Sequence, residues 1–210
     1  MRIEFLGISG VGKTTIANKI VSDMEDNAIN TVWPWKMVYK ENWIIRNIKK
    51  GISVLFGGIR HIGWTGKLAK LLNSLNMNKR DTIKLFFNGV YLKESFSKCR
   101  ADDNIRYIFD EGIIQYIYAI YLRKKTEPEE KIIIELAQLY GLPDYLYVIR
   151  ATSKTIYSRL INRGRKTRIL ETDNLLEDIE KLQTIEQQIV SIILEKGLMD
   201  SEKISIYDNN

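Results

Sequence analysis

Two apolar patterns alternate along the chain and predict its secondary structure. Short, mostly apolar runs are typical of buried strands; they lie at residues 1–6, 29–39, 105–109, 145–149 and 203–207. Between them, apolar residues recur three or four positions apart, the spacing of a helix face. That spacing predicts helices at 13–25, 113–122, 129–140, 153–162 and 172–195. Strands alternating with helices favour an α/β fold, with a parallel five-stranded sheet covered by helices on both faces.

A purely helical pattern fills residues 41–100, between the second and third predicted strands. Its last helix is expected to begin with Asp81 as the N-cap. The string Asn78-Lys79-Arg80-Asp81 also matches the N-K-x-D pattern of guanine readers. A guanine-recognition motif should follow an apolar strand late in the sheet, whereas this string lies between helices. We therefore interpret the match as coincidental.

The stretch Gly51 to Gly66 is rich in glycine, contains Phe56 and Trp64, and has lysines on either side. We expect these residues to pack in the core or around a pocket. Three alternatives stay open at this stage: an amphipathic element that touches a membrane, a lid, or a dimer face.

The loop between the first strand and the first helix carries the clearest chemical signal. Gly7-Ile8-Ser9-Gly10-Val11-Gly12-Lys13-Thr14 fits G-x-x-x-x-G-K-[ST], the phosphate-binding loop or P-loop, and follows an apolar run as that motif requires. Its glycines let backbone N–H groups turn toward a polyphosphate, and the helix N-terminus adds positive potential. Lys13 is expected to reach the outer phosphates, and the Thr14 hydroxyl to hold Mg²⁺. The expected nucleotide-binding residues of this loop are Gly7, Ser9, Gly10, Val11, Gly12, Lys13, Thr14 and Thr15.

A second signal follows the third predicted strand, which ends in Asp110-Glu111-Gly112. An apolar strand that ends in an acid is the Walker B arrangement, in which the carboxylate orients the Mg²⁺ shell. We therefore expect Asp110, with Thr14, at the metal. Either Asp110 or Glu111 is a candidate general base if the acceptor is a hydroxyl.

The densest basic cluster of the chain lies around Gly164. Phosphoryl transfer needs positive charge around the transferred group, and we expect these side chains to form a lid at 159–170. Arg163 and Arg165 are its catalytic candidates, whereas Arg159 and Arg168 are expected to hold the nucleotide. A solvated basic surface or an RNA contact is the alternative.

Composition restricts the partners. The 210 residues include one cysteine, Cys99, and one histidine, His61, which excludes an internal disulfide and a cysteine or histidine metal cluster. The formal charge of +6 favours anionic partners without choosing among them. We find no secretory signal and no apolar run of about 18 residues that could span a membrane, and therefore expect a cytoplasmic protein.

With these motifs, the sequence resembles the P-loop nucleoside and nucleotide kinases, and within them the thymidylate-kinase-like branch. The resemblance rests on three stretches: Gly7 to Thr14; Asp110 to Gly112 with Gln115 and Tyr118; and 143–165, which is similar to the fourth strand, helix and lid of that family. It implies one domain over 1–210, a strand order of 2-3-1-4-5, an acceptor-side insertion at 40–100, and transfer of the γ-phosphoryl group of ATP, with Mg²⁺, to a small molecule.

The chain departs from that family in two places. Glu111 stands where thymidylate kinases have an arginine that touches the acceptor's phosphate, which disfavours a phosphorylated acceptor. Nucleoside kinases keep an acid after the second strand, whereas here the sequence reads Trp33-Pro34-Trp35-Lys36. Trp33 and Trp35 are candidates to stack on an acceptor ring, and plain packing is as good an interpretation of them.

The function we expect is therefore that of an ATP- and Mg²⁺-dependent small-molecule kinase. The acceptor can be a nucleoside, a nucleotide, a sugar, a lipid head group or an envelope precursor. A nucleotide-dependent switch or ATPase and a nucleic-acid-binding ATPase are the rivals, although we do not expect a nucleic-acid partner. The acceptor and the oligomeric state stay open, and apolar helices within 40–100 allow a homodimer.

Overall fold

The computed structural model describes residues 1–33, 43–99, 102, 104–163 and 174–210, with only the backbone for 43–50. Its centre is a five-stranded parallel sheet in the order β2-β3-β1-β4-β5. The strands are β1 (Arg2–Leu6), β2 (Asn30–Val32), β3 (Ile105–Phe109), β4 (Tyr145–Arg150) and β5 (Ile204–Asp208). The predicted α/β class and strand order are confirmed.

The register of the sheet decides which side chains share its carboxyl edge. β1 lies between β3 and β4, with Glu4 opposite Phe109 and Leu6 opposite Val148. The loops that follow β1 and β3 therefore emerge side by side, as expected for neighbouring parallel strands.

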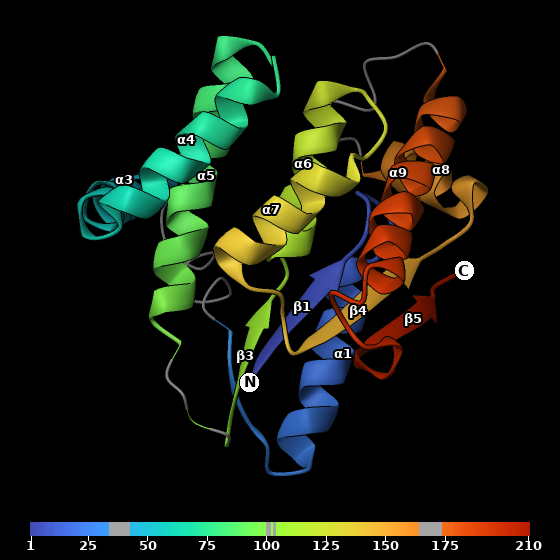
Figure 1. The fold of residues 1–210 in the computed structure, drawn as a ribbon. Coiled ribbons are helices and arrows are strands. Elements are labelled where there is room, and N and C mark those ends of the chain that lie inside the picture. Colours follow the sequence, from blue (N-terminus) through green and yellow to red (C-terminus); the bar gives the residue numbers. More distant parts are fainter. Residues whose placement is uncertain (34–42, 100–101, 103, 164–173) are drawn as a thin grey trace.

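Helices cover both faces of the sheet (Figure 1). They are α1 (Lys13–Asp26), α3 (Trp43–Arg60), α4 (Ile62–Ser74), α5 (Lys79–Ser97), α6 (Ile113–Lys124), α7 (Glu130–Tyr140), α8 (Ser153–Asn162) and α9 (Leu175–Glu195). Parallel crossovers are right-handed. Because α1 leads toward the β2 edge while α6 and α7 lead toward the β5 edge, α1 lies on the face opposite α6 and α7.

Within the described residues 43–99, the predicted helical segment forms three helices, which lie at the opposite side of the molecule from β5 (Figure 1). The prediction that Asp81 is an N-cap is wrong. Asn78 has extended backbone and accepts a 2.9 Å hydrogen bond from the Asp81 N–H, so the helix begins at Lys79. The N-K-x-D string is thus the first turn of α5, where an asparagine cap satisfies an otherwise free N–H group.

The second strand, β2, spans Asn30–Val32 and lies within the predicted stretch 29–39, of which residues 34–39 lie outside the described residues. The expectation that the stretch 51–66 packs in the core holds only in part: Val54 and Trp64 lie against the core, whereas Leu55, Phe56 and Ile59 are exposed. In the part of the chain that the structure describes, no helix is both long and apolar enough to cross a bilayer.

Candidate active site

The loop after β1 has the backbone geometry that phosphate binding requires. Gly10 and Gly12 both have φ of +90°, a left-handed conformation that other residues adopt only with strain. Gly12 is the N-cap of α1 and has no side chain to occupy the helix terminus. The first N–H groups of α1 are thus available to an anion at the point where the helix dipole favours negative charge.

Lys13 points across the sheet edge to the end of β3. Its Nζ donates to the backbone carbonyl of Asp110 at 2.6 Å and to Oε1 of Gln115 at 2.9 Å. Gln115 Oε1 also accepts from the Gly7 N–H at 3.3 Å, so one amide joins the lysine to the start of the loop. Burial lowers the pKa of Lys13, and the nearby carboxylates of Glu111 and Asp110 oppose that shift.

Asp110 is buried at the end of β3, and its Oδ1 has no hydrogen-bond partner within the described residues. A buried carboxylate oxygen without a partner is costly unless something binds it. The described residues hold no cluster of three or more His, Cys, Asp or Glu that could bind a metal. A single carboxylate with a nearby hydroxyl suits Mg²⁺, which takes its remaining ligands from phosphate and water, so Asp110 and the exposed Thr14 fit this ion.

A buried carboxylate that we had not predicted lies behind the site. Glu4, in β1, accepts from the Ile114 N–H at 3.2 Å and lies 3.5 Å from Nε of Arg2. Burial raises the pKa of Glu4, while Arg2 and the N–H groups at the start of α6 oppose the shift. The carboxylate lies against Gly112, where a Cβ would come within 2.0 Å of Glu4 Cδ. Glu4 therefore fixes the turn that carries Asp110 and Glu111.

The carbonyl of Val11 receives two side-chain donors. Arg159 Nη1 donates to it at 3.0 Å from α8, and Asn209 Nδ2 donates at 2.9 Å from the end of the chain. The Asn209 N–H is itself held by the Arg150 carbonyl at 2.7 Å. With this carbonyl turned toward Arg159 and Asn209, the loop keeps one orientation.

The other predicted residues fall into three groups. Ser9, Thr15 and Glu111 are exposed beside the loop, and Arg163 is exposed at the C-cap of α8. Arg165, Arg168 and Trp35 lie outside the described residues. Trp33 and Tyr118 are buried in the core, so neither side chain exposes a ring face on which an acceptor could stack.

Sequence reasoning named Gln115 as part of the family resemblance, and it missed Glu4 and Asn209. The signal for Glu4 was present, because an acid inside an apolar strand needs a partner. Asn209 had no such signal, since its partner is 198 positions away.

No model of a known protein family matches the chain, and no curated protein matches it. Among solved structures, the chain is similar to deoxyadenosine kinase from M. mycoides. With bound dCTP that structure has 17% identity and a TM-score of 0.47, covering 99% of this chain and 90% of the other. With the products dCMP and a flexible dCDP, the identity is 15% and the TM-score 0.49, covering 99% of this chain and 90% of the other. With bound dATP, the identity is 17% and the TM-score 0.46, covering 99% of this chain and 91% of the other. At these identities the similarity concerns the fold alone.

Proposed function

We propose that the protein is an ATP- and Mg²⁺-dependent phosphotransferase that moves the γ-phosphoryl group to the hydroxyl of a small molecule. One contact supports this most: Lys13 Nζ lies 2.6 Å from the Asp110 carbonyl oxygen. A phosphate-reaching lysine and a metal-orienting acid thus lie at one sheet edge, beside a helix N-terminus. Catalysis of phosphoryl transfer consists mainly of such placement and charge stabilisation.

Each group then has a defined task. The N–H groups of residues 10 and 12–14 bind the β- and γ-phosphates, and Lys13, still bonded to Gln115, turns from the Asp110 carbonyl to the phosphate oxygens. Thr14 and Asp110 would hold Mg²⁺, which would supply positive charge to stabilise the transferred group. The acceptor oxygen forms a bond to the γ-phosphorus as the bond to the ADP oxygen breaks. The hydroxyl proton passes to a carboxylate, Asp110 or Glu111.

Glu111 favours a hydroxyl over a phosphate as the acceptor group. It is exposed one residue after Asp110 and next to Gly112, where a carboxylate repels a phosphate but accepts a hydroxyl proton. A nucleoside is the first candidate, because the sequence resembles the nucleoside and nucleotide kinases. A sugar or a lipid head group has the same chemistry.

Arginines from the end of α8 complete the proposal. Arg159 lies at the loop through its bond to the Val11 carbonyl, and Arg163 follows one turn later. With Arg165 and Arg168 they form the proposed lid over the phosphates, where an arginine can contribute about 10³-fold or more in rate.

The test is a screen for ADP formation from ATP and Mg²⁺ with nucleosides, nucleoside monophosphates, sugars and alcohols. We expect turnover with a hydroxyl-bearing acceptor, and its loss in Lys13→Ala. Lys19→Ala, an exposed lysine of the same helix, is the matched control and should retain activity. ATP hydrolysis that no small molecule stimulates would contradict the proposal in favour of a switch, and stimulation by RNA or DNA alone would favour a nucleic-acid-binding ATPase.

A further inference from the structure

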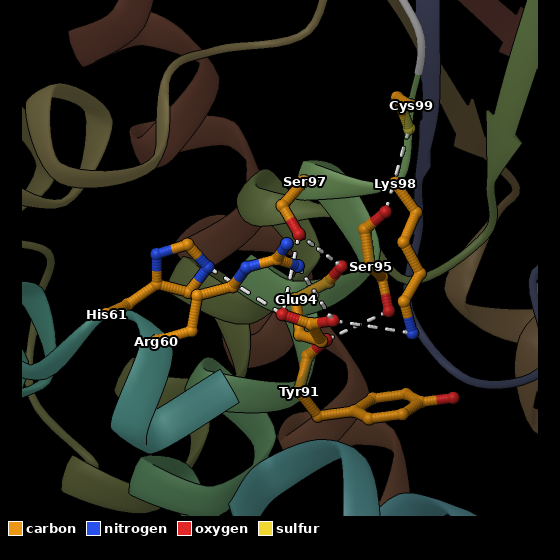
Figure 2. A network of polar contacts seen from close by, with 8 residues as sticks. All are labelled: Arg60, His61, Tyr91, Glu94, Ser95, Ser97, Lys98 and Cys99. Carbon is orange, nitrogen blue, oxygen red and sulfur yellow. Dashed lines mark hydrogen bonds and ion pairs between the residues drawn. The ribbon is translucent and has the colours of Figure 1, made fainter. Parts of the chain in front are cut away.

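The inner side of helix α3 combines an apolar contact, Val54 against the core, with polar contacts to α5. Gly57 lies against α5, where an added Cβ would come within 3.1 Å of Glu94 Cβ. The buried carboxylate of Glu94 lies 3.9 Å from Arg60 Nη1 and 3.7 Å from His61 Nε2, and it also pairs with Lys98 at 3.6 Å (Figure 2). These contacts hold the end of α3 on α5 and determine which side of α3 faces outward.

The outward side of α3 is apolar. Ile52, Leu55, Phe56 and Ile59 recur three or four positions apart, and Ile62 continues the series at the start of α4; their exposed fractions are 51%, 63%, 65%, 67% and 76%. A surface helix ordinarily turns its apolar stripe toward the core. Single exposed apolar residues need no explanation, but a contiguous stripe of this kind marks an interaction surface. We name these five residues the outer stripe.

The chain segment that carries the outer stripe is strongly basic. Residues 42–80 contain eight Lys and Arg and no Asp or Glu. The whole chain has 32 Lys and Arg, so 24 remain outside this segment, against 26 Asp and Glu. The entire positive excess of the protein therefore resides in 42–80. Lys67 and Lys70 are exposed on α4, and Lys70 shares a helix face with Gly66 and Ile62, which lie four and eight positions before it.

We infer that the outer stripe and the lysines of α4 bind the surface of an anionic lipid bilayer. A basic helix with a continuous apolar face lies in the membrane interface, where apolar side chains enter the acyl boundary and cations meet anionic head groups. The exposed Gly63 and Gly66, where an added Cβ would meet nothing within 4 Å, add no bulk that would keep the face from a flat surface. This inference is independent of the proposed phosphotransferase activity.

Charge and apolarity also argue against a second copy of the chain, or a nucleic acid, as the partner of the outer stripe. A second copy would bring a second strongly basic segment with no acid to pair with it, and like charges at close range oppose association. Nucleic acid would satisfy the cations but would leave five aliphatic or aromatic side chains without a partner. Of these three partners, only an anionic bilayer offers both an apolar phase and negative charge.

The test is co-sedimentation of the full chain with vesicles of phosphatidylcholine alone, or with about 30 mol% phosphatidylglycerol. We expect binding to the anionic vesicles, at least about tenfold weaker binding to the neutral ones, and weakening by salt. Phe56→Ser should weaken binding about tenfold or more, because it removes one large apolar group. Lys70→Glu should weaken it about fivefold or more.

Two matched controls lie away from this face. Ile206→Ser removes a half-exposed apolar side chain from β5, and Lys19→Glu reverses an exposed lysine of α1; both should bind like the wild type. Leu55→Ser replaces Phe56→Ser if that variant fails to fold by circular dichroism. Absence of binding to anionic vesicles would overturn the inference, as would equal binding by all variants. A concentration-dependent dimer that Phe56→Ser abolishes, without vesicle binding, would assign the outer stripe to a second copy.

Discussion

The carboxylate of Glu4, in the middle of β1, accepts a hydrogen bond of 3.2 Å from the backbone N–H of Ile114 at the start of α6. It joins the strand that leads into the P-loop to the helix that follows Asp110 and Glu111. Both halves of the candidate site are thus attached to one buried side chain. A carboxylate at a helix N-terminus is also favoured by the helix dipole.

Gly112→Ala should destabilise the protein by about 2 kcal/mol or more, because the new Cβ would lie 2.0 Å from Glu4 Cδ and overpack a buried site. Urea unfolding at neutral pH measures this change. Gly66→Ala is the matched control: it lies in α4 with open space around it, and it should stabilise the protein by about 0.5 kcal/mol. Equal effects of the two substitutions would contradict the packing argument.

Glu4→Gln should change how stability depends on pH. Burial raises the folded-state pKa of Glu4 above 4.5, so the folded state holds this proton more tightly than the unfolded state. The free energy of unfolding of the wild type, relative to Glu4→Gln, should therefore be greatest below pH 4.5 and fall as the pH rises through the raised pKa. Urea unfolding of both proteins across acidic and neutral pH tests this, and a difference independent of pH would contradict it.

Gln115→Ala should lower kcat/KM for ATP about tenfold, because Lys13 and the Gly7 N–H both lose their bond to the same amide. A hydrogen bond to a charged group contributes about 1.5–3 kcal/mol. Steady-state kinetics with the acceptor from the screen provide the measurement. Gln138→Ala, an exposed glutamine of α7, should leave kcat/KM unchanged; a similar loss there would point to a general effect of the substitution.

Arg159 and Asn209 should compensate for each other. Each donates to the Val11 carbonyl, so either Arg159→Ala or Asn209→Ala leaves one donor, whereas the double variant leaves none. We expect ATP affinity to fall less than about fivefold for Asn209→Ala. The loss of binding free energy in the double variant should exceed the sum of the losses in the two single variants. Calorimetric titration with ATP measures these affinities. Strict additivity would show that the shared carbonyl does not couple the two residues.

Alanine at Arg163 and Arg165 should reduce kcat by about 10²-fold or more with little change in nucleotide affinity, as expected for charges that act mainly in the transition state. Single-turnover kinetics and ATP titration separate the two effects. Arg60→Ala is the control and should change neither; Arg60 ends α3, a helix that lies on the opposite side of the molecule from α8 (Figure 1). A loss of affinity alone would favour a plain basic surface.

The sequence by itself determined the parts of this protein whose geometry is local. The P-loop is an octapeptide whose glycines adopt the required backbone angles, and the alternation of apolar runs with helical stripes is enough to predict the parallel sheet. Asp110 was recognisable because a strand precedes it. The start of α5 was predicted wrongly because Asn78 and Asp81 are both residue types that favour the N-cap position. Only the backbone conformation of Asn78 decides between them.

The tertiary structure decided the contacts that join distant residues. The register of β1 against β3 places Glu4 beside Gly112, and the end of the chain brings Asn209 to Val11. The outward direction of the α3 stripe depends on contacts between the end of α3 and the buried Glu94 of α5, which the spacing of apolar residues does not reveal. Periodicity records which residues share a face, but the direction of that face depends on what packs behind it.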